Sequence, residues 1–285
     1  MGSVLALLSA ILFAAAALVI RRGMQRSTAT TATLISISTN LVATWLLSIL
    51  LGSLGRITLP AAATLLLAGV FAPALARFTY YESMTLIGVA RASTISNTTP
   101  LFAAVLAVPV LGERLSWQLA AGTVLVVVGI ALTARPDQAA TSARPWAGVL
   151  LALNTAVMAS VSFMLRKLGL RMLPDPAVAS ALTLTGSMLV LLPFVIYRSR
   201  REPLRAGRQA FTLLFIGSVL TTGAFLSYFF ALNLSELVRV TPLANTTPIF
   251  ALVLLYLFRQ EETIRAGTVA GAVITVAGIL FVLIG

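Results

Sequence analysis

The chain has 285 residues, of which 59% are hydrophobic and only 10% are charged, and its formal net charge is +12. A soluble globular domain has about a quarter charged residues, so this composition indicates a polytopic membrane protein. The sequence contains no cysteine and no histidine, which excludes disulfides, a thiol nucleophile, a histidine-based triad and a Cys/His zinc site. We therefore expect no catalytic centre, no metal site and no cofactor.

The basic residues fall in short clusters between apolar runs, as at Arg21-Arg22 and Arg200-Arg201. Loops on the cytosolic side of a membrane protein are enriched in Lys and Arg, and that explains the positive charge without a nucleic-acid partner. We expect the lipid bilayer and a small-molecule substrate as partners, and no nucleic acid.

Ten apolar runs follow one another, each close to the ~20 residues that a helix needs to cross hydrocarbon. They cover about residues 3–20, 33–51, 60–81, 90–111 and 117–133, then 146–165, 177–197, 211–232, 238–258 and 264–284. The first run lacks a preceding basic residue and is interpreted as a retained helix, not a signal peptide. The sequence thus predicts an all-α polytopic membrane protein with ten transmembrane helices.

The two halves of the chain repeat one another. The tetrapeptide Asn97-Thr98-Thr99-Pro100 recurs 148 residues later as Asn245-Thr246-Thr247-Pro248, and Tyr80 and Arg91 match Tyr228 and Arg239 at the same offset. We assign a first five-helix repeat to residues 1–134, a connecting loop to 135–145 and a second repeat to 146–285. Since five spans is an odd number, the second repeat is expected to be inverted in the membrane, as in many secondary transporters.

Each tetrapeptide lies inside an apolar run, where a proline removes a backbone donor and frees the carbonyl four residues earlier. The freed carbonyls are those of Ser96 and Ala244. Broken helices are tolerated in a membrane only against a cavity or other protein. We therefore predict that both tetrapeptides line a substrate path. The alternative is that Asn97 and Asn245 only cap the helices or satisfy the carbonyls freed by the prolines.

Three other side chains are candidates. Tyr80 and Tyr228 either line the path or belong to an aromatic belt at the membrane surface. Glu82, whose counterpart is Phe230, is a possible coupling residue, because a buried carboxylate can carry a proton. Glu113 is expected to be structural, accepting backbone N–H groups at the start of the fifth helix, as Glu262 is for the tenth.

The five-helix repeats, the polar-then-proline start of the fourth helix and the turn Leu111-Gly112-Glu113-Arg114-Leu115 resemble the EamA-type family of the drug/metabolite transporter superfamily. The second turn, Arg259-Gln260-Glu261-Glu262-Thr263, departs from the pattern but keeps a glutamate. The resemblance implies a bundle whose third, fourth, eighth and ninth helices line a central cavity. It also implies substrates among amino acids, metabolites or drugs, often moved outward.

We expect a secondary transporter, with alternating access, in the cytoplasmic (inner) membrane. The alternatives are a passive channel or facilitator and a non-transporting receptor or scaffold. Glycines repeated in the fifth and tenth helices indicate close packing, either between the halves or in a homodimer, so a monomer and a homodimer both remain open. Loop charges, thirteen against six, place both termini outside, whereas the resemblance implies cytosolic termini for some relatives.

Overall fold

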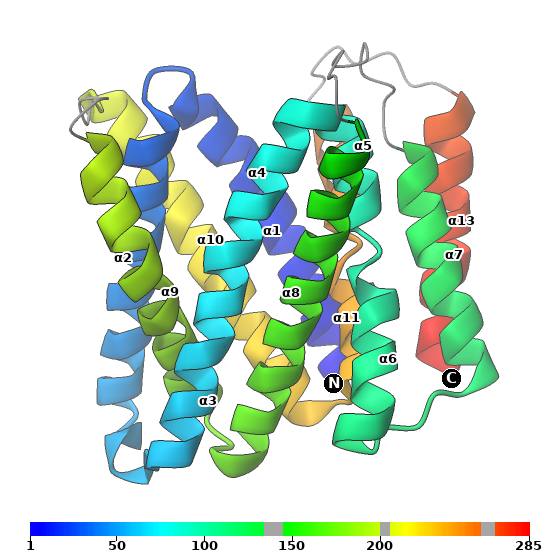
Figure 1. Cartoon of the computed structure of the whole chain (residues 1–285), viewed down its shortest axis with the longest axis horizontal. Coiled ribbons are helices and arrows are strands. Elements are labelled where there is room, and N and C mark those ends of the chain that lie inside the picture. Colours follow the sequence, from blue (N-terminus) through cyan, green and yellow to red (C-terminus); the bar gives the residue numbers. More distant parts are fainter. Residues whose placement is uncertain (134–144, 200–205, 258–265) are drawn as a thin grey trace.

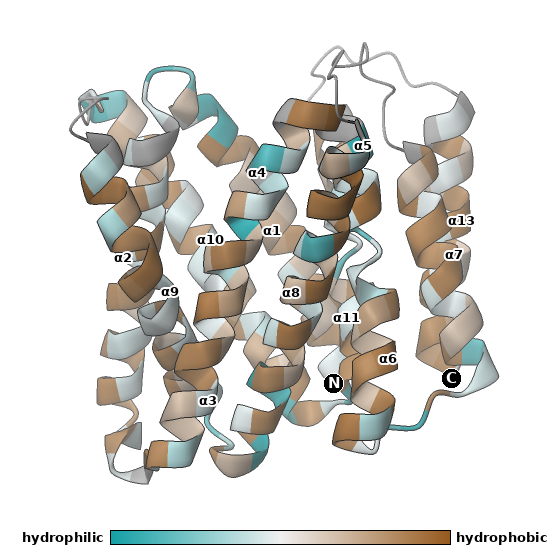
Figure 2. Cartoon of the chain, in the orientation of Figure 1, coloured by the Kyte–Doolittle hydropathy of each residue, from teal (hydrophilic) through white to brown (hydrophobic). Residues whose placement is uncertain are grey.

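The protein's structure is a computed structural model that describes residues 1–133, 145–199, 206–257 and 266–285 (Figure 1). Within these ranges the chain is helical, apart from turns and one isolated antiparallel bridge between Ser27 and Ala206. Apolar residues cover most of each long helix (Figure 2).

The helices of the first half are α1 (Gly2–Met24), α2 (Ala29–Leu50), the short η1 (Ser53–Arg56), α3 (Leu59–Gly69), η2 (Val70–Leu75), α4 (Ala76–Ile87), α5 (Val89–Ser96), α6 (Thr99–Leu111) and α7 (Trp117–Thr133). Those of the second half are α8 (Pro145–Met172), α9 (Pro176–Ser199), α10 (Arg208–Leu234), α11 (Leu237–Ala244), α12 (Thr247–Leu257) and α13 (Ala266–Ile284).

Eight helical segments in the described ranges are long and apolar enough to cross a membrane. Two shorter apolar helices, Trp117–Leu132 and Val269–Ile284, accompany them. With a mean hydropathy of +1.01 over the chain, these segments make the protein an integral multi-pass membrane protein.

The two halves run in opposite directions. In Figure 1, α1 runs upward from the N-terminus, whereas α8 runs downward from the upper side of the view. Both termini lie toward the lower side. We call the side of the bundle with the α6–α7 and α10–α11 connections the terminal face. The side with the α1–α2 and α9–α10 connections is the opposite face.

The contacts between helices also follow the repeat: a contact of a first-half helix with a second-half helix is matched by a contact between their repeat-related counterparts. Helix α1 packs on α10 as α8 packs on α3 and α4, and α2 packs on α10 as α9 packs on α3. Helices α7 and α13 pack on each other at one edge of the bundle (Figure 1). There a Cβ placed on Gly122 would lie 2.8 Å from the carbonyl oxygen of Gly278. The predicted glycine faces are thus used between the halves of one chain.

Two predicted spans need correction. The sixth was expected to end at residue 165, but α8 continues to Met172, so Arg166 and Lys167 lie within a helix and not in a loop. The chain has no helix-breaking residue between them and Pro174, apart from a single glycine. The third run, expected to be one helix, is interrupted at η2, where Ala72 is extended (φ −148°, ψ 135°) before Pro73.

Candidate functional site

Both tetrapeptides form a break between two half-helices. Helix α5 ends at Ser96 and α6 begins at Thr99, and the second break lies between α11 and α12. The Thr99 hydroxyl donates to the carbonyl of Ser96 at 2.7 Å, and the Thr247 hydroxyl donates to that of Ala244 at 3.1 Å. These are the carbonyls that the prolines were predicted to free, so the residue before each proline supplies the missing donor.

The remaining tetrapeptide side chains bond back into the preceding half-helix. Thr98 donates to the carbonyl of Ile95 and Thr246 to that of Leu243, both at 2.6 Å. The Asn245 amide donates to the Thr241 carbonyl at 2.9 Å.

The amide of Asn97 donates to the Ser93 hydroxyl at 3.3 Å. Both asparagines are half-buried, and neither bonds to a carbonyl freed by a proline. Lining of a substrate path by these residues stays a prediction.

Helix α8 satisfies the backbone at the η2 break. The Ser162 hydroxyl donates to the carbonyls of Ala68 at 2.8 Å and Ala72 at 3.0 Å. The Arg166 guanidinium donates to the Ala72 carbonyl at 2.7 Å. A break in the first half is therefore stabilised by polar side chains of the second half.

Arg166 was missed at the sequence level, where it was counted as a loop charge. Its side chain is only 3% exposed. Its guanidinium carbon lies 5.1 to 5.9 Å from the ring centroids of four aromatic residues: Phe163, Phe225, Tyr228 and Phe229. Among the described residues, its Nε and the Tyr228 hydroxyl are buried without a hydrogen-bond partner. Buried cations in membrane helices are costly and are usually functional. We call Arg166 and these rings the aromatic cage.

Three charged side chains tie helix ends together at the terminal face. The carboxylate of Glu113, 4% exposed, accepts the N–H groups of Leu237 at 2.8 Å and Val238 at 2.9 Å, at the start of α11. Lys167 and Arg171 of α8 bind carbonyls at the ends of α10 and α6. Each charge thus lies at the helix end whose dipole it stabilises. We call Glu113, Lys167 and Arg171 the terminal-face cluster.

The prediction for Glu113 was therefore wrong about which helix its carboxylate binds. It was predicted to accept from the fifth helix, but it binds α11, in the other half. Gly112 is left-handed (φ 65°) and turns the chain away from the axis of α6 before Glu113, while the Ser116 hydroxyl accepts the Leu119 N–H in α7. Glu262 lies outside the described residues.

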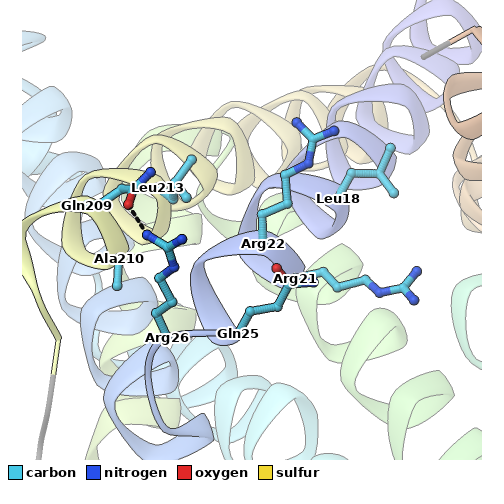
Figure 3. A pocket seen from close by; sticks show the side chains of 8 residues that line it. All are labelled: Leu18, Arg21, Arg22, Gln25, Arg26, Gln209, Ala210 and Leu213. Atoms are coloured by element: carbon cyan, nitrogen blue, oxygen red, sulfur yellow. Dashed lines mark hydrogen bonds between the residues drawn. The ribbon is translucent and has the colours of Figure 1, made fainter. Parts of the chain in front are cut away.

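Among the described residues, the corresponding contacts are not found at the opposite face. At the front of the repeats, where the offset is 146, the counterparts of Lys167 and Arg171 are Arg21 and Gln25. Both are exposed and line a pocket of about 430 Å³ between α1 and α10 (Figure 3). Helix α6 packs against α11, whereas the described residues of the corresponding pair, α5 and α12, pack less closely. Repeat-related residues are thus found in two different environments.

The other predicted residues are separated from one another. Tyr228 belongs to the aromatic cage, and Tyr80 is half-buried in a cluster with Ile87 and Ala92. The side chain of Glu82 is exposed in the middle of α4, so the burial on which its proton-carrying role was argued is absent in this conformation. That role stays a prediction.

A family model described as the EamA-like transporter family matches residues 1–135 and 146–284. The chain belongs to the EamA-like transporter family. The resemblance seen in the sequence is confirmed, and the protein is a membrane transporter of the drug/metabolite transporter type. Matching solved structures include one titled "Crystal structure of protein", with a TM-score of 0.81, 15% identity and coverage of 99% of this chain and 98% of that one. Such low identity supports the fold alone. No match was found among curated proteins.

Proposed function

We propose that this EamA-like protein is a secondary transporter that exports a small organic solute across the cytoplasmic membrane by alternating access. Ten membrane-crossing segments in two inverted five-helix repeats would provide the frame. The observation that carries the proposal is the difference between the two faces, which are built from repeat-related residues but hold different contacts.

An inverted repeat suggests what the second conformation is. If the halves exchange their local structures, the contacts at the terminal face open and their counterparts form at the opposite face. Arg21 would then donate to carbonyls at the end of α4, as Lys167 now donates to those of Leu232 and Ser235 at 2.5 and 2.6 Å. Helices α5 and α12 would close together as α6 and α11 do now.

The solute would bind between the two helix breaks. Asn97 and Asn245 lie there at the ends of α5 and α11, half-buried and related by the repeat. Discontinuous helices are where many transporters of this architecture hold their substrates. Tyr80 and Tyr228 would contribute to the walls, and Glu82 is the candidate for proton coupling.

The loop charges give the proposed direction. Arg21, Arg22 and Arg26 lie at the opposite face, and cytosolic loops are the ones enriched in basic residues. That face would then be cytosolic, so the conformation described would accept solute from the cytosol and its exchanged counterpart would release it outside.

The test is a thermal-shift screen of amino acids, nucleosides and cationic drugs, followed by counterflow of a labelled hit in proteoliposomes. A ligand that binds the folded state raises its apparent stability. A carrier accumulates labelled solute transiently against excess unlabelled solute, whereas a channel does not. Uptake without counterflow would favour the channel, and a bound hit that is never moved would favour the receptor.

A further inference from the structure

The pocket at the opposite face lies between the last turn of α1 and the first turns of α10 (Figure 3). Its volume is about 430 Å³. Its lining combines three arginines and two amide side chains with an apolar part: Arg21, Arg22, Arg26, Gln25, Gln209, Leu18, Ala210 and Leu213. We call it the basic pocket.

The positive charge of the basic pocket is not balanced by its own lining, which contains no acidic residue in the described part of the chain. Arg26 donates to the side-chain oxygen of Gln209 across the pocket, whereas Arg21 and Arg22 extend outward from the same turn (Figure 3). All three arginines are exposed, and within the described residues Arg21 and Arg22 make no hydrogen bond. The donors of two guanidinium groups are therefore available to an external acceptor.

At the terminal face, the residues related by the repeat to Arg21 and Gln25 have backbone acceptors. Lys167, the counterpart of Arg21, donates to two backbone carbonyls, and Arg171, the counterpart of Gln25, donates to one. In the described part of the chain, Arg21 donates to no backbone carbonyl. In addition, α10 begins beside the pocket and its N-cap, Gly207, provides no side-chain cap, so the positive end of a 27-residue helix adds to the field.

We propose that the basic pocket binds the phosphate headgroup of an anionic membrane lipid. A guanidinium matches phosphate oxygens with paired donors, and basic pockets between transmembrane helices are suited to anionic headgroups. The pocket lies at the ends of membrane-crossing helices, and Leu18 and Leu213 give it an apolar part for the start of the acyl chains. A small free phosphate would leave that part unused.

Binding would also favour one conformation, a consequence that rests on the proposed function. The exchanged conformation needs Arg21 at the end of α4, so a headgroup that holds Arg21 stabilises the conformation described. Binding of the lipid headgroup does not depend on transport. Failure of the lipid proposal can therefore be distinguished from failure of the proposed transport function.

The experiment uses the full chain in phosphatidylcholine nanodiscs, with phosphatidylglycerol, further phosphatidylcholine or inorganic phosphate added. Lipid retention is measured by native mass spectrometry, and stability by the melting temperature. The parent should retain one phosphatidylglycerol and melt higher in its presence. Because each basic residue contributes on the order of tenfold to anionic lipid binding, Arg21→Gln/Arg22→Gln/Arg26→Gln should weaken retention by about 100-fold or more.

A matched triple variant, Arg91→Gln/Arg114→Gln/Arg239→Gln, removes the same charge outside the basic pocket and should change retention less than about threefold. Equal losses in both triple variants would overturn the proposal, since general electrostatics would then explain binding. An equal melting shift from inorganic phosphate alone would show a free phosphate-bearing ligand instead of a lipid. If the triple variant fails to fold, Arg22→Gln alone should still lose retention about tenfold.

Discussion

The terminal face and the opposite face of this transporter are built from the same repeated sequence, yet they are not alike. At the terminal face Lys167 is bound to the end of α10, while its counterpart Arg21 lies exposed in the basic pocket. Identical halves in identical conformations would give the same contacts twice. The counterparts also differ in sequence, as Arg171 and Gln25 do. The proposed alternating access requires in addition that the local contacts of the duplicated fold are compatible with two arrangements.

The third and eighth predicted spans, which are α3 to α4 and α10, differ for another reason. Pro73 interrupts the third helix at η2, but its counterpart Thr221 lies in the continuous α10, where its hydroxyl donates to the Gly217 carbonyl at 2.9 Å. Arg166, which bonds at the η2 break, has Ile20 as its counterpart. The break therefore occurs only in the first half and its buried cation only in the second, and neither has a repeat-related copy.

The largest effect is expected at the aromatic cage. Arg166→Ala should lower the free energy of unfolding by about 3 kcal/mol, because it leaves a cavity among four rings and removes one of the two donors to the Ala72 carbonyl, the other being Ser162. The control, Ile20→Ala, changes the half-buried counterpart and should cost about half as much. Unfolding in mild detergent measures both, and equal losses would mean that the cage has no special role.

A smaller loss is expected where the halves pack without a polar contact. Gly122→Leu should cost about 2 kcal/mol, since its Cβ would overlap the Gly278 carbonyl and push α7 from α13. Gly267→Ala, whose Cβ would lie 3.7 Å from the nearest atom, should change the melting temperature little. Comparable shifts in the two variants would argue against tight packing at Gly122.

The asparagines of the two breaks should matter for solute more than for folding. Asn97→Leu and Asn245→Leu each remove one hydrogen bond to a residue four positions earlier in the same half-helix. Even a hydrogen bond between transmembrane helices is worth only about 0.6 kcal/mol on average. We expect a small melting shift with at least about tenfold weaker binding of a solute found by screening. Parent-like binding, or a loss proportional to the melting shift, would return both residues to a capping role.

The smallest effect on stability is expected for Glu82→Gln, because that side chain is exposed. It should abolish solute accumulation driven by a pH gradient while solute exchange continues. Flux measured in proteoliposomes with and without the gradient separates the two processes. Loss of both, or of neither, would remove Glu82 from proton coupling.

Features set by nearby residues could be predicted from the sequence. The apolar runs and the Thr99 and Thr247 bonds at the breaks depend on residues a few positions apart. The duplication can be seen by comparing the two halves of the sequence directly. Proline alone was ambiguous, because Pro109 and Pro193 lie inside continuous helices whereas Pro73 marks a break.

What could not be predicted depends on partners distant in the chain. Arg166 binds a carbonyl 94 residues away, Lys167 binds carbonyls 65 and 68 residues away, and Glu113 binds N–H groups 124 and 125 residues away. Nothing near a charged side chain in sequence shows that the other half of the fold will supply its partner. Those contacts form the terminal-face cluster and the aromatic cage, so this part of the candidate site required the structure.

The most direct test of alternating access measures both faces at once after Glu113→Gln. That change removes the charge that binds the start of α11 and should weaken closure of the terminal face by about 2 kcal/mol, or roughly 30-fold in population. Because the chain has no cysteine, spin labels on introduced cysteines report single positions. One pair joins positions 114 and 236 at the terminal face, and a second joins 91 and 257 at the opposite face. We predict that Glu113→Gln lengthens the first distance and shortens the second, whereas a longer first distance with an unchanged second would show local loosening and contradict exchange between the faces.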